Sequence, residues 1–331
     1  MNILTLENIS KSFTGKMLFD EASFFLHEGE KVGVIGINGT GKSTLLKIIS
    51  GIEEVDEGKR ILANNLVVRY LPQNPSFDKD ASILETVVNA AGDIKENAAK
   101  SMLNKLGITD FNEKTGNLSG GQRKRLALVS ALLAPSDILV LDEPTNHLDS
   151  YMSTWLETML NSYKGAIVMV THDRYFLDLV CNRIVEVDKG KLYSYDENYS
   201  GFLMRKAERE DIVRATERKN KSILKKEIEW MQRGARARTT KAKAHIKRYE
   251  TLASAKIMED DMTVEMSSAS SRLGKTTVEL ENISKSYGDK KLIDDFSYIF
   301  LKNDRVGIIG HNGCGKSTLM KIIMGLVNSD S

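Results

Sequence analysis

Three short runs of uninterrupted apolar residues mark the first half of the chain. They are VGVI at 32–35, ILVL at 138–141 and AIVMV at 166–170. None of them alternates as a half-exposed strand would, and each is far shorter than the ~20 residues that span a bilayer. The pattern predicts buried parallel strands alternating with helices, and therefore an α/β fold.

A different pattern begins at Tyr199. From there to about residue 256 the chain is charged, has no proline, and contains only Gly201 and Gly234 as glycines. This composition predicts a long helix to about Gln232, a break near Gly234 and a second helix, which together form a helical hairpin.

The sequence also contains a long internal repeat. Residues 6–51 align with residues 280–325 without a gap, at an offset of 274, and more than half of the positions are identical. A period of this length indicates a duplicated domain. We expect a first domain at 1–200, a hairpin linker at 201–260 and the N-terminal part of a second copy at 261–331. The chain then resembles the first half of a longer tandem protein, and we expect the second copy's VGII strand (306–309) and amphipathic helix to be poorly covered.

Composition and charge narrow the class of protein. The 331 residues are 41% hydrophobic and 28% charged, as in ordinary globular proteins. The two cysteines show no metal spacing, and no signal peptide pattern is present, so a cytoplasmic protein without a membrane partner is expected. The net charge of +2 conceals an uneven distribution, because residues 205–250 contain sixteen Lys or Arg against seven Asp or Glu.

A glycine-rich loop follows the first apolar run. GINGTGKS at 36–43 fits the GxxxxGK[ST] pattern, in which backbone amides face nucleotide phosphates. Lys42 is expected to reach the β- and γ-phosphates, Ser43 to bind Mg²⁺, and Thr44 to add a phosphate contact. ATP and Mg²⁺ are therefore the predicted cofactors. The other candidates of this kind are Gly36, Gly39 and Gly41, and in the second copy Gly310, Gly313, Gly315, Lys316, Ser317 and Thr318.

Polar residues follow the other apolar runs. Asp142 and Glu143 come directly after ILVL, where Asp142 can hold the Mg²⁺ shell and Glu143 can deprotonate the attacking water. His172 follows AIVMV and is either structural or a γ-phosphate contact. Gln73 lies in an expected loop, where it could sense Mg²⁺ or the attacking water.

A second anion-binding helix start is expected at Ser119. Ser119 is a candidate N-cap, and Gly120 and Gly121 leave the amides of the following amphipathic helix accessible. One domain binds one nucleotide, so this site should face a nucleotide held by another domain.

Taken together, these motifs resemble those of the ATP-binding cassette (ABC) ATPases. LSGGQ at 118–122, the phosphate loop, Gln73, ILVLDE and His172 occur in the order typical of that family and cover the whole first copy. The resemblance implies a P-loop NTPase fold of the ABC type, with a helical subdomain at about 74–134, and ATP hydrolysis. It also implies adenine stacking by Phe13 and Tyr287. It adds the following nucleotide-binding or metal candidates: Asn38, Gln122, Asp149 and Asn312 for the nucleotide, and Gln73 and Ser317 for Mg²⁺.

The forms DEPTNHLD and VTHDRYFLD, together with the linker, resemble the ABC-F class and its Uup-like branch. In that class the linker reaches toward the tRNA in the peptidyl site of the ribosome. Only 44 residues separate Gln73 from Leu118, so the helical arm that some members insert there is minimal or absent. The candidate contacts to tRNA or rRNA are Arg233, Arg236, Arg238, Lys241 and Lys243.

Three readings of the function follow. The first is an ABC-F translation factor that acts on the ribosome through its basic linker, and the second is the ATPase subunit of a transporter. The third is a DNA-handling ATPase; the 75 residues between Lys42 and Leu118 exclude the type with a long coiled-coil insertion but leave DNA binding by the hairpin open. The basic run could also be only a solvated helix face.

ABC ATPases enclose each nucleotide between one domain's phosphate loop and another domain's LSGGQ. Because this sequence contains one LSGGQ, we expect the chain alone to bind ATP but to hydrolyse it weakly. A second cassette would be needed, either beyond the residues present or in trans by head-to-tail pairing of first copies.

Overall fold

The computed structural model describes residues 1–13, 15–92, 96–232, 276–288, 290–302, 304–310 and 313–330. It separates into two compact units. Residues 1–199 and 272–331 form the first unit, and residues 200–271 form the second.

A six-stranded sheet forms the centre of the first copy. Its order is β5-β6-β7-β3-β8-β9, and every neighbouring pair is parallel except β8 with β9. The three apolar runs form β3, β6 and β7, which confirms the predicted α/β class. The bounds are β3 (Lys31–Ile35), β5 (Val68–Leu71), β6 (Ile138–Asp142), β7 (Ala166–Val170), β8 (Arg183–Asp188) and β9 (Lys191–Tyr195).

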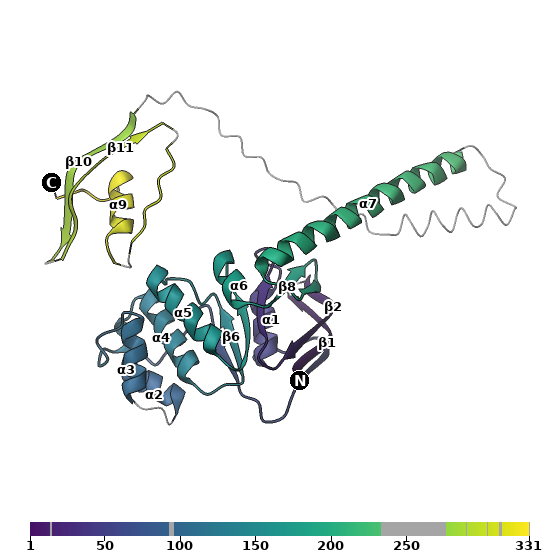
Figure 1. Cartoon of the computed structure of the whole chain (residues 1–331), viewed down its shortest axis with the longest axis horizontal. Coiled ribbons are helices and arrows are strands. Elements are labelled where there is room, and N and C mark those ends of the chain that lie inside the picture. Colours follow the sequence, from purple (N-terminus) through teal and green to yellow (C-terminus); the bar gives the residue numbers. More distant parts are fainter. Residues whose placement is uncertain are drawn as a thin grey trace. The chain divides into compact units, whose positions relative to one another are not determined.

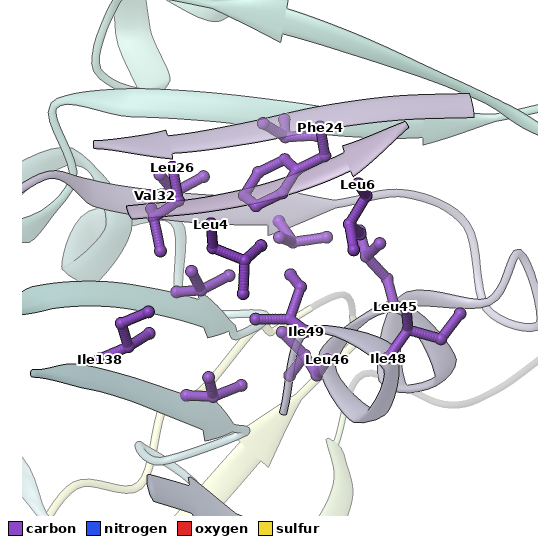
Figure 2. Packing of buried hydrophobic residues seen from close by; sticks show 14 of the residues in the cluster. Leu4, Leu6, Phe24, Leu26, Val32, Leu45, Leu46, Ile48, Ile49 and Ile138 are labelled. Atoms are coloured by element: carbon purple, nitrogen blue, oxygen red, sulfur yellow. The ribbon is translucent and has the colours of Figure 1, made fainter. Parts of the chain in front are cut away.

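A smaller antiparallel sheet shares its core with the central sheet. It has the order β2-β1-β4, formed by β1 (Asn2–Phe13), β2 (Lys16–His27) and β4 (Glu57–Leu62). Helix α1 (Lys42–Ser50) contributes to the same core, with Leu45, Leu46, Ile48 and Ile49 fully buried. Figure 2 shows these side chains packed among Leu4, Leu6 and Phe24 of the small sheet and Val32 and Ile138 of the large one. Burying each such side chain contributes about 1.5–3 kcal/mol, so this core fixes the helix that follows the phosphate loop.

Helices α2 (Ile83–Ala91), α3 (Glu96–Lys105) and α4 (Gly120–Leu133) lie together on one flank of the first copy (Figure 1). The predicted amphipathic character of α4 is wrong in its central turns, where residues 126–131 are all buried. The reason is that α4 contacts α2, α3 and β5 and so has neighbours on several sides. A short 3-10 turn (Thr115–Asn117) precedes α4, and α5 (Ser150–Ser162) and α6 (Arg174–Val180) follow β6 and β7.

The second copy repeats the beginning of the first. β10 (Thr276–Tyr287) and β11 (Lys290–Leu301) form an antiparallel hairpin, and α9 (Lys316–Ile323) packs against it around Leu280, Ile283 and Ile293. The predicted VGII strand is wrong, because residues 304–310 form no strand. The expected poor cover of this region is confirmed, because Ile309 is 94% exposed and no residue of α9 is buried. Among the described residues, nothing takes the places that β7 and β8 have beside β3, so this segment has no strand to pair with.

The linker begins with one long helix. α7 runs from Tyr199 to Gln232, as its charged, glycine-poor sequence predicts. Ion pairs along its exposed surface join Glu210 to Lys206 and Arg214, at 3.9 and 3.5 Å, and each such pair contributes about 0.2–0.5 kcal/mol. The predicted break and second helix lie outside the described residues. Of the helices that the structure describes, none is long and apolar enough to cross a membrane.

Candidate nucleotide-binding site

The phosphate loop of the first copy connects β3 to α1 and has a backbone that only glycine adopts easily. Gly36 has a φ of 155°, and a Cβ there would lie 2.6 Å from the carbonyl oxygen of Val187. Gly41 has a φ of 103° and is the N-cap of α1, a helix that no side chain of the described residues caps. The first amides of α1 therefore face outward, at the positive end of the helix dipole, where an anion is favoured.

Lys42 lies folded across this loop. Its Nζ donates to the carbonyl oxygens of Gly36 and Ile37, at 2.8 and 3.0 Å, and lies 3.5 Å from Oδ1 of Asn38. Partial burial lowers the Lys42 pKa, and the charges of Glu143 and Asp142 counteract part of that effect. The ammonium is thus held at the rim of the loop by neutral carbonyls, which a phosphate can replace as partners.

Asp142 lies at the C-terminal end of β6, with the Ser43 hydroxyl close by. Its carboxyl is 3% exposed, and Tyr70 donates to its Oδ2 at 3.4 Å. Burial raises the pKa of Asp142, and the polar side chains of Ser43 and Tyr70 partly offset the shift. A carboxylate with a hydroxyl nearby provides the hard oxygen ligands that Mg²⁺ prefers.

Glu143 adopts an unusual backbone conformation next to Asp142. Its φ is 55°, and its amide donates to the carbonyl of Val170 at 2.8 Å. The side chain is buried, and Oε1 lies 3.4 Å from Nε2 of His172, while the His172 amide donates to Oε2 at 3.3 Å. Burial raises the pKa of Glu143, and His172 opposes the shift. A strained, buried carboxylate with a fixed orientation has the properties of a general base.

Gln73 shares a pocket with the acidic pair. This pocket is lined by Pro72 and Gln73 from the loop after β5, by Asp142 and Glu143, and by Lys124 and other residues of α4. The structure therefore brings Gln73 beside both carboxylates, a relation that no spacing in the sequence specifies. His172 is also brought there, with its side chain largely exposed.

The LSGGQ motif forms the start of α4. Ser119 is the N-cap: its Oγ accepts from the Gln122 amide at 3.3 Å, and Gln122 Oε1 accepts from the Ser119 amide at 2.9 Å. Gly121 lies near His147, and Asp149 caps α5 by accepting from the Met152 amide at 3.0 Å. Helix α4 contacts α2, α3 and β5, whereas α1 contacts β5, β6 and β7. The two helix starts thus belong to different flanks of the first copy (Figure 1).

The two aromatic candidates occupy equivalent hairpin positions. Phe13 ends β1 and is 42% exposed, and Tyr287 ends β10 and is 52% exposed. The second copy's loop also repeats the first: Gly310, Gly313 and Gly315 have φ values of 153°, 77° and 100°, and Lys316 donates to the carbonyl of Gly310 at 2.7 Å. Thr44, Ser317 and Thr318 lie in the first turns of α1 and α9.

Several predicted site residues lie in parts of the chain that the structure does not describe. Asn312, and the basic residues Arg233, Arg236, Arg238, Lys241 and Lys243, lie outside the described residues. Their assignments remain predictions.

Two residues were missed by the sequence analysis. Tyr70 was missed because its contact with Asp142 depends on the pairing of β5 with β6, which no pattern in the sequence specifies. Lys11 is a buried lysine that lies over the Phe13 ring. Its signal was available, because a lysine occurs two positions before the candidate aromatic in both copies.

A glycine loop lies between the parallel strand β3 and a helix without a side-chain cap, and an acidic pair lies at the end of β6, which is separated from β3 by β7. This arrangement defines a P-loop nucleotide site. The residues present fit MgATP, because Asp142 and the nearby Ser43 hydroxyl offer hard oxygen ligands beside a helix start that no side chain of the described residues caps.

Family comparisons give the same class. A family model described as "ABC transporter" matches residues 19–146 and 293–331, and a second model with that description matches residues 185–266. The chain is 39% identical to the "Uncharacterized ABC transporter ATP-binding protein YfmR" of Bacillus subtilis, over 98% of this chain and 58% of that protein. It is 35% identical to the "Energy-dependent translational throttle protein EttA" of Escherichia coli, over 99% of this chain and 67% of that protein.

The solved structures agree on the fold. An ATP-binding subunit of an ABC transporter superimposes with a TM-score of 0.53 at 22% identity, over 58% of this chain and 89% of the other. The chain belongs to the ABC family of ATP-binding proteins, and within it to the ABC-F group that includes EttA. It spans 58% of YfmR and about two thirds of the EttA proteins.

Proposed function

We propose that the first copy binds MgATP and, with a second cassette as a lid, hydrolyses it. The observations that carry this proposal are the glycine-rich loop before a helix that has no side-chain cap, and the buried Asp142 and Glu143, whose charges act on Lys42 of that loop. Lys42 and the loop amides would hold the phosphates, and Phe13 would stack on the adenine. Bound Mg²⁺ would be held by Ser43, Asp142 and Gln73, and would supply the charge that neutralises the β- and γ-phosphate oxygens.

In this proposal Glu143 takes the proton of the attacking water. Its orientation comes from the His172 amide, and its raised pKa makes the carboxylate a stronger base than an exposed glutamate. His172 would contact the γ-phosphate from the exposed side of Glu143. Glu143, the proposed proton acceptor, is thus adjacent to Asp142, whose carboxylate would bind Mg²⁺.

The same proposal requires the LSGGQ motif of a second cassette to cover the nucleotide bound at the phosphate loop. The Ser119 helix start and the phosphate loop lie on different flanks of the first copy, so Ser119 is suited to close a site on another cassette. Head-to-tail pairing of two first copies would supply two such lids.

Single-turnover hydrolysis by the Glu143→Gln variant tests the chemistry. The expected rate falls by about 100-fold or more, the usual contribution of a general base, while MgATP affinity stays within about twofold. Glu85→Gln is the matched control, because that glutamate only caps α2. An unchanged rate in Glu143→Gln would remove this residue from the role of base. Activity that rises with the square of the protein concentration would support pairing in trans.

We further propose that the protein acts in translation and that its basic linker binds rRNA or tRNA. Support comes from relatives named translational throttle proteins and from the charge of residues 233–250, which include seven Lys or Arg and one acid. Helix α7 carries nine basic and six acidic residues, and ion pairs join some of them. Most of the excess positive charge of the linker therefore lies in residues 233–250, after α7. A phosphate backbone is the natural partner of such a segment.

Ribosome pelleting across a range of salt concentrations tests the linker. Replacing Arg233, Arg236 and Arg238 together with Glu is expected to weaken pelleting and to flatten its salt dependence. The same substitution at Arg205, Arg209 and Arg214, on α7, serves as the matched control. Equal pelleting at all salt concentrations would leave a solvated helix face as the explanation, and tighter binding to duplex DNA than to ribosomes would favour the DNA-handling alternative.

A further inference from the structure

Lys11 is the most buried lysine described in the first copy, and its position calls for an explanation. Only 8% of it is exposed, although it lies next to the solvent-accessible ring of Phe13. Its Nζ lies 2.9 Å from Oε1 of Glu53 and 3.1 Å from Oδ1 of Asp56, and donates to the Glu54 carbonyl at 2.8 Å. The hydrogen bond to Glu53 is the main reason that the pKa of Lys11 is raised. All the partners of this ammonium come from the segment between α1 and β4.

The same ammonium lies over an aromatic ring. Lys11 Nζ is 5.1 Å from the centroid of Phe13, within the range of a cation–π contact. Asp56 also accepts from the amide of Ser12, at 2.8 Å, so the residue between Lys11 and Phe13 is fixed as well. These contacts hold the end of β1 against residues 53–56, the segment that follows α1. The cation lies over one face of the Phe13 ring, and the residue is still 42% exposed, which leaves surface for a planar partner.

The arrangement recurs in the second copy at the offset of 274. Lys285 lies 2.5 Å from Oδ1 of Asp330 and 5.7 Å from the ring centroid of Tyr287, and Ser286 donates its amide to Asp330 at 2.7 Å. The surroundings of the two copies differ, because α1 has four buried residues and α9 has none. The contact among lysine, aspartate and aromatic ring is present in both copies, so it does not depend on the surroundings in which they differ.

We infer that Lys11 is a positioning residue for the base-stacking ring, which it holds from the face opposite the nucleotide base; Lys285 does the same for Tyr287. This inference rests on the proposed binding of ATP by the loop. Lys11 also connects the two ends of the nucleotide site, because its acidic partners follow the helix whose N-terminus would hold the phosphates. A ring fixed before binding loses less conformational freedom when a base stacks on it, which raises affinity.

The test separates base binding from phosphate binding. Calorimetric titrations are made with MgATP and with magnesium tripolyphosphate, which has no base. The full chain carries Lys316→Ala, which weakens the second copy's loop, so that the measured heat comes from binding at the first copy. Lys11→Met keeps the length of the side chain and removes its charge. We expect Lys11→Met to raise the dissociation constant for ATP by roughly three- to tenfold, with tripolyphosphate binding unchanged.

Two further variants show whether Lys11 acts through the ring. Phe13→Ala should weaken ATP binding, and adding Lys11→Met to it should cause no further loss. Lys11→Arg retains a cation over the ring and should restore most of the affinity. Thermal unfolding of each variant shows whether the small sheet remains folded, and Lys285→Met, the equivalent change in the other copy, is the matched control.

The outcomes are distinguishable. A loss that is equal for ATP and tripolyphosphate, or that persists in full beside Phe13→Ala, would make Lys11 a purely structural residue and overturn the inference. ATP affinity unchanged in Lys11→Met would overturn it as well. A parent protein that binds neither ATP nor tripolyphosphate would instead overturn the proposed function itself, and this inference with it.

Discussion

The two copies of the repeat share their local structure but differ in everything that depends on distant partners. The hairpins pair in the same register, with Leu6 opposite Phe24 in the first copy and Leu280 opposite Tyr298 in the second. The three glycines of each phosphate loop have nearly identical φ angles. Yet residues 32–35 form a buried strand, whereas the equivalent residues 306–309 form none. Hairpin and loop are thus specified by nearby residues, and the strand before the loop forms only where other strands lie beside it.

The difference bears directly on the site. In the first copy the central sheet brings Asp142, Glu143 and His172 to the phosphate loop from β6 and β7. The second copy has the loop and its lysine, but none of its described residues is a counterpart of Asp142 or Glu143. A phosphate loop alone can bind an anion, while water activation needs residues delivered by the sheet.

The largest expected contrast concerns the core beneath each loop helix. Ile48 is fully buried in α1, and its equivalent Ile322 in α9 is only partly buried. Ile48→Ala should lower the free energy of unfolding by about 2–5 kcal/mol through lost burial and a residual cavity, and Ile322→Ala should lower it by less than about 1 kcal/mol. Denaturant melts that follow each copy separately provide the measurement. Equal losses would mean that both helices lie in equivalent cores.

A smaller contrast is expected for the loop lysines. Lys42→Ala should weaken MgATP binding by roughly 10- to 100-fold, because a hydrogen bond to a charged group contributes about 1.5–3 kcal/mol. Lys316→Ala should change overall affinity much less, since its loop lacks a partner like Asp142 among the described residues. Calorimetry on both variants compares them, and the reverse order of effects would contradict the assignment of the main site to the first copy.

The smallest effect concerns the charge that the first copy buries. Burial raises the pKa of Asp142, so its ionised form costs stability at pH values above that raised pKa, and this cost disappears as the pH falls through it. Asp142→Asn should therefore raise the melting temperature at neutral pH while weakening the Mg²⁺ dependence of ATP binding. A lower melting temperature in this variant at neutral pH would show that the carboxylate is a net stabilising group.

The same logic gives a pH dependence for hydrolysis. Because the pKa of Glu143 is raised by burial, the carboxylate should be lost on acidification at a higher pH than that of an exposed glutamate. The hydrolysis rate should accordingly fall on the acidic side within a range where ordinary glutamates are still ionised. A rate that stays constant down to the usual range of a glutamate would contradict the role of Glu143 as base.

The sequence predicted those features that nearby residues determine. The apolar runs at β3, β6 and β7 and the charged helix α7 were evident, because each has a pattern of its own. The strand at 306–309 was predicted from the same kind of pattern and was wrong, because an apolar run becomes a strand only beside another strand. The Tyr70–Asp142 and Lys11–Asp56 contacts join residues 72 and 45 positions apart, and only the folded chain reveals them.

Amide hydrogen exchange on the full chain tests the contrast between the copies most directly. The account predicts that amides of residues 32–35, paired with β7 and β8, exchange at least about 100-fold more slowly than those of residues 306–309, while loop residues 36–41 and 310–315 exchange at similar rates without nucleotide. Addition of MgATP should slow exchange mainly at 36–44. Equal protection of 32–35 and 306–309 would contradict the claim that only the first copy has a supported strand behind its phosphate loop.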